Sequence, residues 1–282
     1  MKHETPEPTM THPNEARPVV IKLGGALLTD PALLEPLWRD VARLRETTPV
    51  VLVHGGGPQA TAMARRLGHE PRIVHGRRVT TDLDLDIIQW TIRGKLNTQL
   101  VAQAARFDVP AVGVSGADGG LVQVVRRPPW HVDGEEVDFG WVGDVEYVKA
   151  DVLATLLRSG YVPVVAPLGI DVEGQVYNVN ADTVAQAIAQ ALRAAAFFLV
   201  TEAGGVRRDP FAPESFLPHC DAATFEEGTA SGWIAGGMRV KLKVAFDALR
   251  AGVPEVFILA PHHLFDRERA TRIVLSHPAE ET

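Results

Sequence analysis

The hydrophobic residues of this chain fall into short runs rich in valine and isoleucine, which alternate with longer segments of helical spacing. The short runs have the length and composition of buried strands, and they cover residues 18–23, 50–53, 109–114, 162–165, 196–201, 255–259 and 271–276. The longer segments are helical in pattern, and they cover residues 31–46, 58–67, 82–107, 150–159, 182–193, 222–227 and 238–251. Strands separated by helices of this length predict right-handed βαβ units and a mainly parallel sheet.

The pattern changes between residues 121 and 149. Strand-like pieces there are interrupted by Pro128-Pro129 and by Gly134. Proline removes a hydrogen bond from a sheet and glycine favours turns, so we expect β-hairpins inserted at the edge of the sheet. A further hairpin is expected over residues 172–179, around Glu173-Gly174.

Length and composition are those of an ordinary globular protein. The 282 residues, 46% of them hydrophobic, are enough for one large core or for two lobes that share a sheet. The net charge of −7 argues against a nucleic-acid partner, because such proteins normally carry a basic face. No uninterrupted apolar run approaches the roughly 20 residues of a membrane span, so no membrane partner is expected.

Cysteine usage and the first residues indicate a cytoplasmic protein. Cys220 is the only cysteine, which excludes a disulfide within one chain and a cysteine-rich metal site. This fits a reducing compartment, and Cys220 is interpreted as chemically passive. Residues 1–17 are polar, contain three prolines and lack the apolar stretch of a secretory signal, so they are interpreted as a disordered tail.

Two glycine turns, each directly after a predicted strand, give the first chemical signal. Lys22-Leu23 leads into Gly24-Gly25, and Val53-His54 leads into Gly55-Gly56-Gly57. Consecutive glycines bring backbone N–H groups close to an anion, and a lysine in an apolar strand costs desolvation unless it meets an anion. Together these features predict a phosphate-handling enzyme. The P-loop, dinucleotide-binding, protein-kinase and HExxH zinc-protease motifs are missing.

Polar residues at three other places are candidates for the same site. Arg77-Arg78 lies in a predicted loop, where arginine suits bidentate carboxylate binding and a solvated pair is the alternative. In residues 178–182 alternation lets Asn178, Asn180 and Asp182 project together, although Asp182 alone also fits a helix N-cap. Lys241, in the first turn of a predicted helix, opposes the helix dipole and indicates an anionic ligand, with an exposed lysine as the alternative.

Several other polar residues are not assigned to the chemistry. His54, His262 and His263 do not form a convincing metal set, so no protein metal site is predicted. His54 is interpreted as a structural hydrogen-bonding residue, and the segment from Ser115 to Gly120 as a turn.

Taken in order, these motifs resemble the amino acid kinase family, and within it the acetylglutamate kinases. The resemblance covers residues 18 to about 260. It rests on Val20-Ile21-Lys22-Leu23-Gly24-Gly25, His54-Gly55-Gly56-Gly57-Pro58, Gly76-Arg77-Arg78-Val79-Thr80, Gly113-Val114-Ser115-Gly116-Ala117-Asp118-Gly119, Tyr161-Val162-Pro163-Val164-Val165-Ala166-Pro167, Asn178–Asp182 and Gly236-Gly237-Met238-Arg239-Val240-Lys241.

The resemblance implies an α/β fold, a three-layer αβα sandwich around a mainly parallel sheet. It implies an N-terminal lobe over residues 18–177 that binds an acyl amino acid and dimerises, and a C-terminal lobe over residues 178–282 that binds the nucleotide. The implied activity is phosphorylation of the γ-carboxylate of N-acetyl-L-glutamate by ATP with Mg²⁺, in arginine biosynthesis.

The resemblance also implies roles for individual residues. Lys22 and Lys241 flank the transferring phosphoryl group, and Asp182 lies between them. The expected substrate contacts are Gly24, Gly25, Gly56, Gly57, Arg78, Asn178 and Asn180. The expected nucleotide contacts are Thr201, Glu202, Gly204, Gly205, Gly236, Gly237 and Met238.

The sequence departs from the family pattern in three places. Thr201–Gly205 stands where the family usually has an aspartate and a Pro-Gly or Ser-Gly turn, and the closing Gly-Thr turn near the C-terminus is absent. Arginine-inhibited relatives carry an extra N-terminal helix that links dimers into a hexamer, whereas residues 1–17 have little helical periodicity. We therefore expect a homodimer that arginine does not inhibit.

Two alternative functions remain open at this point. The first is a related kinase that phosphorylates aminoadipate carried on a small acidic protein, for which a basic surface at Arg72, Arg77, Arg126 and Arg127 would be suited. The Asn-Val-Asn-Ala-Asp string favours acetylglutamate instead. The second is an inactive amino-acid-sensing module, which the presence of Lys22, Asp182 and Lys241 argues against.

Overall fold

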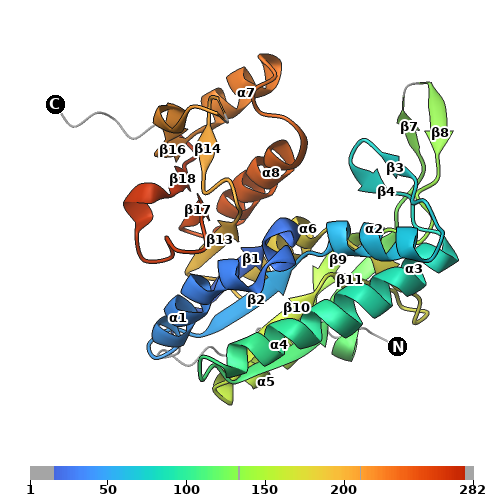
Figure 1. The fold of residues 1–282 in the computed structure, drawn as a ribbon, viewed down its shortest axis with the longest axis horizontal. Helices are drawn as coiled ribbons and strands as arrows, with labels where there is room; N and C mark the ends of the chain where they lie inside the picture. The colour runs from blue at the N-terminus through green and yellow to red at the C-terminus, as the bar shows by residue number, and fades with distance from the viewer. Residues whose placement is uncertain (1–15, 133, 210, 277–282) are drawn as a thin grey trace, which may run out of the picture.

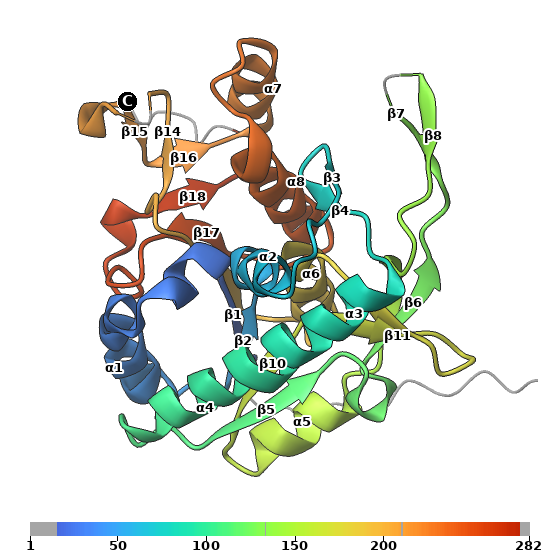
Figure 2. The same ribbon diagram turned by 45° about the vertical axis from the view of Figure 1, so that its right-hand side comes forward.

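The computed structural model describes residues 16–132, 134–209 and 211–276, and its central feature is an eight-stranded sheet (Figures 1 and 2). The strands lie in the order β16 (His219–Cys220), β18 (Thr271–Ile273), β17 (Val256–Leu259), β13 (Ala196–Val200), β1 (Val19–Leu23), β2 (Val50–His54), β10 (Val162–Ala166) and β5 (Ala111–Ser115). The six strands from β17 to β5 are parallel, and β18 pairs antiparallel with β17. The predicted mainly parallel sheet is confirmed, while the predicted tail lies outside the described residues except for Ala16 and Arg17.

Both faces of the sheet are covered by helices, which explains why its strands are continuous apolar runs. Successive residues of β1 face opposite cores: Val20 packs with α5 (Asp151–Arg158), α6 (Ala181–Ala191) and α8 (Gly236–Arg250). Val19 and Ile21 pack on the other side with α1 (Glu35–Leu44) and α4 (Asn97–Ala105). The three-layer αβα arrangement is therefore confirmed (Figure 2).

The long helix predicted over residues 82–107 exists but contains a wider turn in its middle. It consists of α3 (Asp82–Ile88), a π-helical segment (Gln89–Leu96) and α4. Thr81 caps it, because its hydroxyl accepts from the Asp84 N–H while the Asp84 carboxylate accepts from the Thr81 N–H. A π-helix has a wider turn than an α-helix, and the spacing of hydrophobic residues does not distinguish the two over so short a segment. The π segment was therefore not predictable from the pattern.

The hairpins predicted at the sheet edge form a separate sheet instead. Its strand order is β12 (Val176–Asn178), β11 (Leu168–Ile170), β6 (Val122–Arg126) and β9 (Gly143–Val148). The hairpin around Glu173-Gly174 is confirmed as β11–β12, although its first strand begins at Leu168 rather than near Val172. The prediction of edge insertion is wrong because β11 pairs with β6 and β12, and so builds a second sheet with partners of its own.

Two very short hairpins project on the same side of the molecule (Figure 1). The first is β3 (Ile73–Val74) with β4 (Arg77–Arg78), and the second is β7 (Trp130–Val132) with β8 (Glu135–Val137). Arg77-Arg78 therefore lies on a strand rather than in the predicted loop. A third short pair joins β14 (Val206–Arg207) to β15 (Phe216–Leu217).

The helix ends differ slightly from the predicted ones. The segment 31–46 begins as a 3₁₀-helix (Pro31–Leu34) before α1. The segment 58–67 is α2 (Gly57–Arg66), and 222–227 extends into α7 (Ala222–Ala230). Helix α8 begins at Gly236, so Lys241 lies in its second turn and not in its first. Within the described part of the chain, no helix combines the length and apolar character needed to cross a membrane.

Candidate active site

Two lysines and one aspartate meet at the carboxyl end of the central sheet. Lys22 lies on β1, Asp182 in the first turn of α6 and Lys241 on α8. The Lys22 Nζ is 2.7 Å from Asp182 Oδ1, and the Lys241 Nζ is 3.7 Å from Asp182 Oδ2. One carboxylate therefore separates two ammonium groups that come from different elements.

Burial and charge together fix the ionisation of this group. Burial raises the pKa of Asp182, but the charges of Lys22 and Lys241 more than offset this, and the pKa lies below its ordinary value. Burial lowers the pKa of Lys22, and Asp182 opposes that effect. With Asp182 ionised, two cations share one anion, so the group carries an uncompensated positive charge that favours an anionic ligand.

Asp182 is free to face the lysines because another residue caps the helix. The Asn180 Oδ1 accepts hydrogen bonds from the Asp182 N–H at 2.9 Å and from the Thr183 N–H at 3.1 Å. Asn180 is thus the N-cap of α6, and the alternative that Asp182 is a plain N-cap is wrong.

The two glycine turns lie against each other, as their strands do. Leu23 of β1 is opposite His54 of β2, so Gly24-Gly25 and Gly55–Gly57 follow neighbouring strand ends. A Cβ on Gly25 would be 3.1 Å from the Gly56 nitrogen, and one on Gly56 would be 2.7 Å from the Leu96 Cδ1. A Cβ would therefore be crowded at Gly25 and would clash at Gly56, which explains why glycine stands at both places.

The Gly24 N–H is already used within the fold. It donates to the Val200 carbonyl at 3.1 Å, and Gly24 does not line the cavity beside Lys22. The expectation of an N–H contact to substrate at Gly24 is therefore not met in this conformation, because that N–H extends the ladder between β1 and β13. Gly25, Gly56 and Gly57 do line the cavity.

A cavity of about 460 Å³ lies between the glycine turns and the short hairpins. It brings together most of the predicted acceptor-site residues, namely Lys22, Gly25, Gly56, Gly57, Arg78, Asn178, Asn180 and Asp182. Arg77 and Arg127 line it as well. The cavity is therefore rich in cations and hydrogen-bond donors and suits a small ligand with more than one anionic group.

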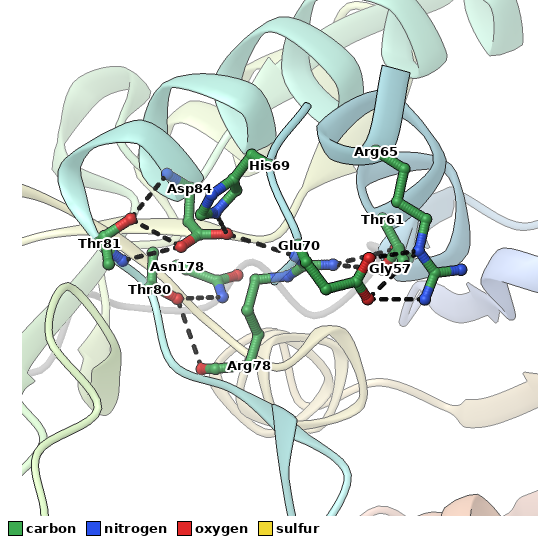
Figure 3. A network of polar contacts seen from close by, with 10 residues as sticks. All are labelled: Gly57, Thr61, Arg65, His69, Glu70, Arg78, Thr80, Thr81, Asp84 and Asn178. Atoms are coloured by element: carbon green, nitrogen blue, oxygen red, sulfur yellow. Dashed lines mark hydrogen bonds and ion pairs between the residues drawn. The ribbon is translucent and has the colours of Figure 1, made fainter. Parts of the chain in front are cut away.

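Arg78 is held in place by hydrogen bonds that its guanidinium donates to the elements around it (Figure 3). It donates to the Thr61 Oγ1 of α2 at 2.5 Å and to the Asp84 Oδ1 of α3 at 3.4 Å. Asp84 also contacts the His69 Nε2 at 3.1 Å. Burial raises the pKa of Asp84, but the hydrogen bonds from Thr81 and the contact with His69 outweigh this effect. The pKa of Asp84 therefore lies below its ordinary value, and the carboxylate stays ionised beside Arg78.

Asn178 is oriented by Thr80, which belongs to the polar network around Arg78. Its Nδ2 donates to the Thr80 Oγ1 at 3.1 Å, as Figure 3 shows. Its backbone N–H donates to the Trp141 carbonyl. Arg78 and Asn178 thus present a guanidinium and an amide to one cavity from different sheets.

The family of the chain follows from comparison with known proteins. A sequence model of the amino acid kinase family matches residues 17–260. The chain belongs to the amino acid kinase family. It is 45% identical over 245 residues to an acetylglutamate kinase of Anaeromyxobacter dehalogenans, which covers 86% of this chain and 90% of that protein. An acetylglutamate kinase of Methanopyrus kandleri is 44% identical over 239 residues, covering 85% of this chain and 93% of that protein.

Solved structures share the fold of this amino acid kinase. The protein smu.665 from Streptococcus mutans has a TM-score of 0.75 at 24% identity, covering 86% of this chain and 94% of that one. An N-acetylglutamate synthase from Neisseria gonorrhoeae has a TM-score of 0.76 at 23% identity, covering 94% of this chain and 61% of that one. At these identities the likeness concerns the fold alone.

The residues expected to contact nucleotide do not all line one cavity in this kinase. Glu202 and Gly204 line a second cavity of about 390 Å³ with residues of β14, β15 and the segment after β17. Gly204 has a φ of 73°, which favours glycine at that position. The first turn of α8, which precedes Lys241 in the helix, contains Gly236, Gly237 and Met238. This turn lines neither of the two cavities. Thr201 and Gly205 line neither as well.

The donor set does not offer a protein-held magnesium site. Among the described residues, no group of three or more histidine, cysteine, aspartate or glutamate side chains is arranged to hold a metal ion. Both carboxylate oxygens of Asp182 face lysines. A Mg²⁺ ion accompanying a nucleotide would be held mainly by phosphate oxygens and water, with one or two protein carboxylates at most.

The residues set aside from the chemistry have structural roles. The His54 Nδ1 donates to the Gly55 carbonyl at 2.8 Å and its Nε2 accepts from the Asn97 Nδ2 at 3.1 Å, so His54 is confirmed as a hydrogen-bonding residue. Burial lowers the pKa of His54 to about 4. Cys220 is fully buried, and burial also raises the pKa of its thiol to about 12, which agrees with its interpretation as a passive residue. The Ser115–Gly120 turn is confirmed, since Asp118 accepts hydrogen bonds from the Ser115 N–H and hydroxyl.

Sequence reasoning missed the residues that support Arg78, and it named Arg127 only for an alternative. Thr61 and Asp84 lie on two helices and meet Arg78 only in the folded chain. The Thr81-x-x-Asp84 spacing is a capping-box pattern that would have identified Asp84 as a buried helix-start residue. No local pattern identifies Thr61 or Arg127.

Proposed function

We propose that this protein transfers the terminal phosphoryl group of ATP to the γ-carboxylate of N-acetyl-L-glutamate, giving N-acetyl-L-glutamyl 5-phosphate and ADP in arginine biosynthesis. The observation that carries the proposal is the group Lys22–Asp182–Lys241, in which one carboxylate is shared by two ammonium ions. The named relatives, which are acetylglutamate kinases matched over nine tenths of their length or more, supply the substrate. They favour this acceptor over carrier-bound aminoadipate.

The acceptor needs no general base. A carboxylate is ionised at neutral pH and is already the nucleophile. The protein must bring two anions together and neutralise charge on the equatorial oxygens of the phosphoryl group during transfer. Lys22 and Lys241 do this from opposite sides of Asp182, and Asp182 keeps the two ammonium groups in position.

The glycine turns complete the binding of the transferring group. Gly25, Gly56 and Gly57 line the cavity next to Lys22 and present backbone to it. Their N–H groups bind phosphoryl oxygens, which requires that no side chain intervene. At Gly56 a side chain would clash with Leu96 and Ile92, so only glycine fits there.

The rest of the cavity binds the acceptor. The Arg78 guanidinium forms a paired contact with the α-carboxylate of N-acetyl-L-glutamate, since its planar fork matches a carboxylate. Asn178 donates to the same substrate, and Asn180, whose Oδ1 caps α6, faces it with its amide nitrogen. The supporting observation is that all three line the cavity that contains Lys22 and Asp182.

The nucleotide binds on the C-terminal side of the lysines. Thr201, Glu202, Gly204 and Gly205 border its base and sugar, and Gly236, Gly237 and Met238 cover its phosphates. Bound Mg²⁺ supplies further charge neutralisation on the phosphates.

Residues 18–177 form the acceptor lobe and residues 178–282 the nucleotide lobe of a cytoplasmic homodimer that arginine does not inhibit. Light scattering with and without arginine tests the dimer.

The activity is tested by ADP release coupled to NADH oxidation, with MgATP and three acceptors. N-acetyl-L-glutamate is expected to support turnover, whereas free L-glutamate, which carries an ammonium group in place of the amide, is not. Carrier-bound aminoadipate is the third acceptor. Turnover with the carrier-bound acceptor alone, or with none of the three, would contradict the proposal.

A further inference from the structure

Three arginines line the acceptor cavity, and their charges are compensated to different degrees. Arg78 pairs with Asp84 at 3.4 Å, and Arg127 pairs with Asp144, with 3.0 Å between Nε and Oδ1. In the part of the chain that the structure describes, no carboxylate lies within ion-pair distance of Arg77. Arg77 is therefore the one of the three guanidinium groups that is left for an external anion.

Arg77 is placed by a tryptophan from the other hairpin. Its guanidinium carbon lies 5.1 Å from the centre of the Trp130 ring, and that of Arg127 lies 4.9 Å from the same ring. The Phe139 ring meets Trp130 edge-on at 5.2 Å. Arg77 belongs to β4 and Trp130 to β7, so this contact joins hairpins more than fifty residues apart in the chain.

A small apolar cluster keeps the two hairpins together. Val137, Phe139 and Val142 are buried, and Val74 and Val79 of the first hairpin region pack against them with Trp130. The Thr80 N–H donates to the Phe139 carbonyl, which adds a backbone link. This cluster is separate from the two cores that flank the main sheet, so it orients the arginines without involving the catalytic lysines.

The surroundings of Arg77 also favour an anionic partner. Burial lowers the pKa of Arg77, the positive charge of Arg127 lowers it further, and Asp144 opposes them. A guanidinium that is half-buried near a second guanidinium is stabilised when a carboxylate enters.

We propose that Arg77 is a second carboxylate-binding residue of the acceptor site, which contacts the α-carboxylate together with Arg78, and that Trp130 is its positioning residue. A carboxylate has about four lone-pair positions and accepts hydrogen bonds from two guanidinium groups at once. Successive residues of a strand point to opposite faces, yet Arg77 and Arg78 both line this cavity, so two guanidinium groups border it from different directions. The inference rests on the proposed function, because it assigns the acceptor's α-carboxylate to this wall.

The test compares two acceptors that differ only at that carboxylate. The kcat/KM of wild type and of Arg77→Leu is measured with N-acetyl-L-glutamate and with its α-methyl ester, in the range where rate is linear in acceptor concentration. Arg77→Leu is expected to lose about 10- to 100-fold with the acid, the size of a hydrogen bond to a charged group. With the ester it is expected to equal wild type, because that acceptor offers no carboxylate to Arg77.

Matched variants separate binding from folding. Arg72→Leu removes an exposed arginine of the same segment that does not line the cavity, and it is expected to keep wild-type values with both acceptors. Arg77→Lys keeps the charge without the fork and is expected to lie between wild type and Arg77→Leu. Arg77→Gln replaces the leucine variant if that variant does not fold.

Trp130 variants test the positioning role. Trp130→Ala removes the cation–π contacts with Arg77 and Arg127, and it is expected to lower kcat/KM for the acid about 3- to 10-fold and to leave the ester unaffected. Trp130→Phe keeps an aromatic face and is expected to restore most of the loss.

Each result bears on a different claim. An equal loss with acid and ester in Arg77→Leu, or no loss with either, would overturn the inference while the proposed function stands. Absence of wild-type turnover with N-acetyl-L-glutamate would overturn the proposed function itself.

Discussion

The proposed catalytic group and the arginine wall of the cavity carry positive charge in different ways. The proposed catalytic group is Lys22, Asp182 and Lys241, which lie on a central strand and two long helices, with the first two almost fully buried. The arginine wall is Arg77 and Arg78, which form the two-residue strand β4, and Arg127, which directly follows the end of β6. The first group shares one carboxylate, whereas two of the three arginines have carboxylates of their own.

This difference follows from what each part has to do. Charge that stabilises a phosphoryl group in transfer must be fixed before the substrates arrive, and deep burial on regular elements fixes it. Charge that recognises one acceptor among similar ones is placed by local contacts, such as those of Arg78 with Thr61 and Asp84. The catalytic group should therefore be sensitive to any loss of charge, and the wall should respond in smaller, separable steps.

The largest expected effect is on stability when the shared carboxylate is removed. Asp182→Asn leaves two adjacent cations, one of them buried, and should lower the free energy of unfolding by about 3–5 kcal/mol. The control is Glu227→Gln, because Glu227 pairs with Arg208 at the same 2.7 Å on the exposed surface. That change should cost less than about 1 kcal/mol. Urea unfolding measures both, and equal losses would contradict the role of burial.

A second effect appears on acidification, through His54. Its pKa is about 4 in the folded protein and 6.5 without the fold. The unfolded chain therefore binds the proton first, so His54 contributes stability that is fully present above about pH 6.5 and is lost as the pH falls toward 4. The loss amounts to about 3 kcal/mol, from 1.36 kcal/mol per unit of pKa.

The measurement is the free energy of unfolding between pH 4 and pH 7 in wild type, His54→Gln and His219→Gln. His219 is exposed and serves as the control. His54→Gln should flatten the dependence on pH, and His219→Gln should not. The same slope in all three proteins would rule out His54 as its source.

A third effect tests the packing of the glycine turns. A Cβ on Gly56 would lie 2.7 Å from the Leu96 Cδ1 and 2.9 Å from the Ile92 Cγ1, whereas one on Gly57 meets nothing within 4 Å. Gly56→Ala should therefore lower the free energy of unfolding by about 1–3 kcal/mol, as overpacking does. Gly57→Ala should leave the melting temperature unchanged within a degree or two. Equal melting temperatures would show that the turn is looser than the structure has it.

The smallest effect concerns the support of Arg78. Thr61→Val removes the hydroxyl that accepts from Arg78 at 2.5 Å. The KM for N-acetyl-L-glutamate should rise about 3- to 10-fold with little change in kcat, since one hydrogen bond contributes about 0.5–1.5 kcal/mol. Thr155→Val is the control, because Thr155 accepts from Arg158 at 3.2 Å on the exposed surface of α5. A fall in kcat instead of a rise in KM would place Thr61 in a different role.

Sequence was sufficient for the parts of this molecule that are encoded locally. The strands that carry Lys22 and lead into the glycine turns are almost continuous apolar runs. Such runs are needed because helices cover both faces of the sheet and bury every position of these strands. Asp182 was identified by spacing. Lys241 was identified from an expected position in the first turn of its helix, although α8 begins earlier and places it in the second turn. Their meeting follows from the parallel sheet, which brings β1 and the start of α6 to one edge.

The arginine wall was less accessible to sequence reasoning for a physical reason. Strands of two residues have no periodicity, so β3–β4 was taken for a loop. The contact between Arg77 and Trp130 joins two hairpins that only the folded chain brings together. The second sheet was missed because the partner of β6 is β11, more than forty residues later.

The most direct test of the central claim compares two lysines of α8. Lys241 faces Asp182, while Lys243, two residues later, is exposed. With saturating MgATP and N-acetyl-L-glutamate, Lys241→Ala should lower kcat by about 10²–10³-fold, the size seen when one donor to a developing charge is removed. Lys243→Ala should keep the wild-type kcat. A near-normal kcat in Lys241→Ala would contradict the assignment of the shared carboxylate and its two lysines to phosphoryl transfer.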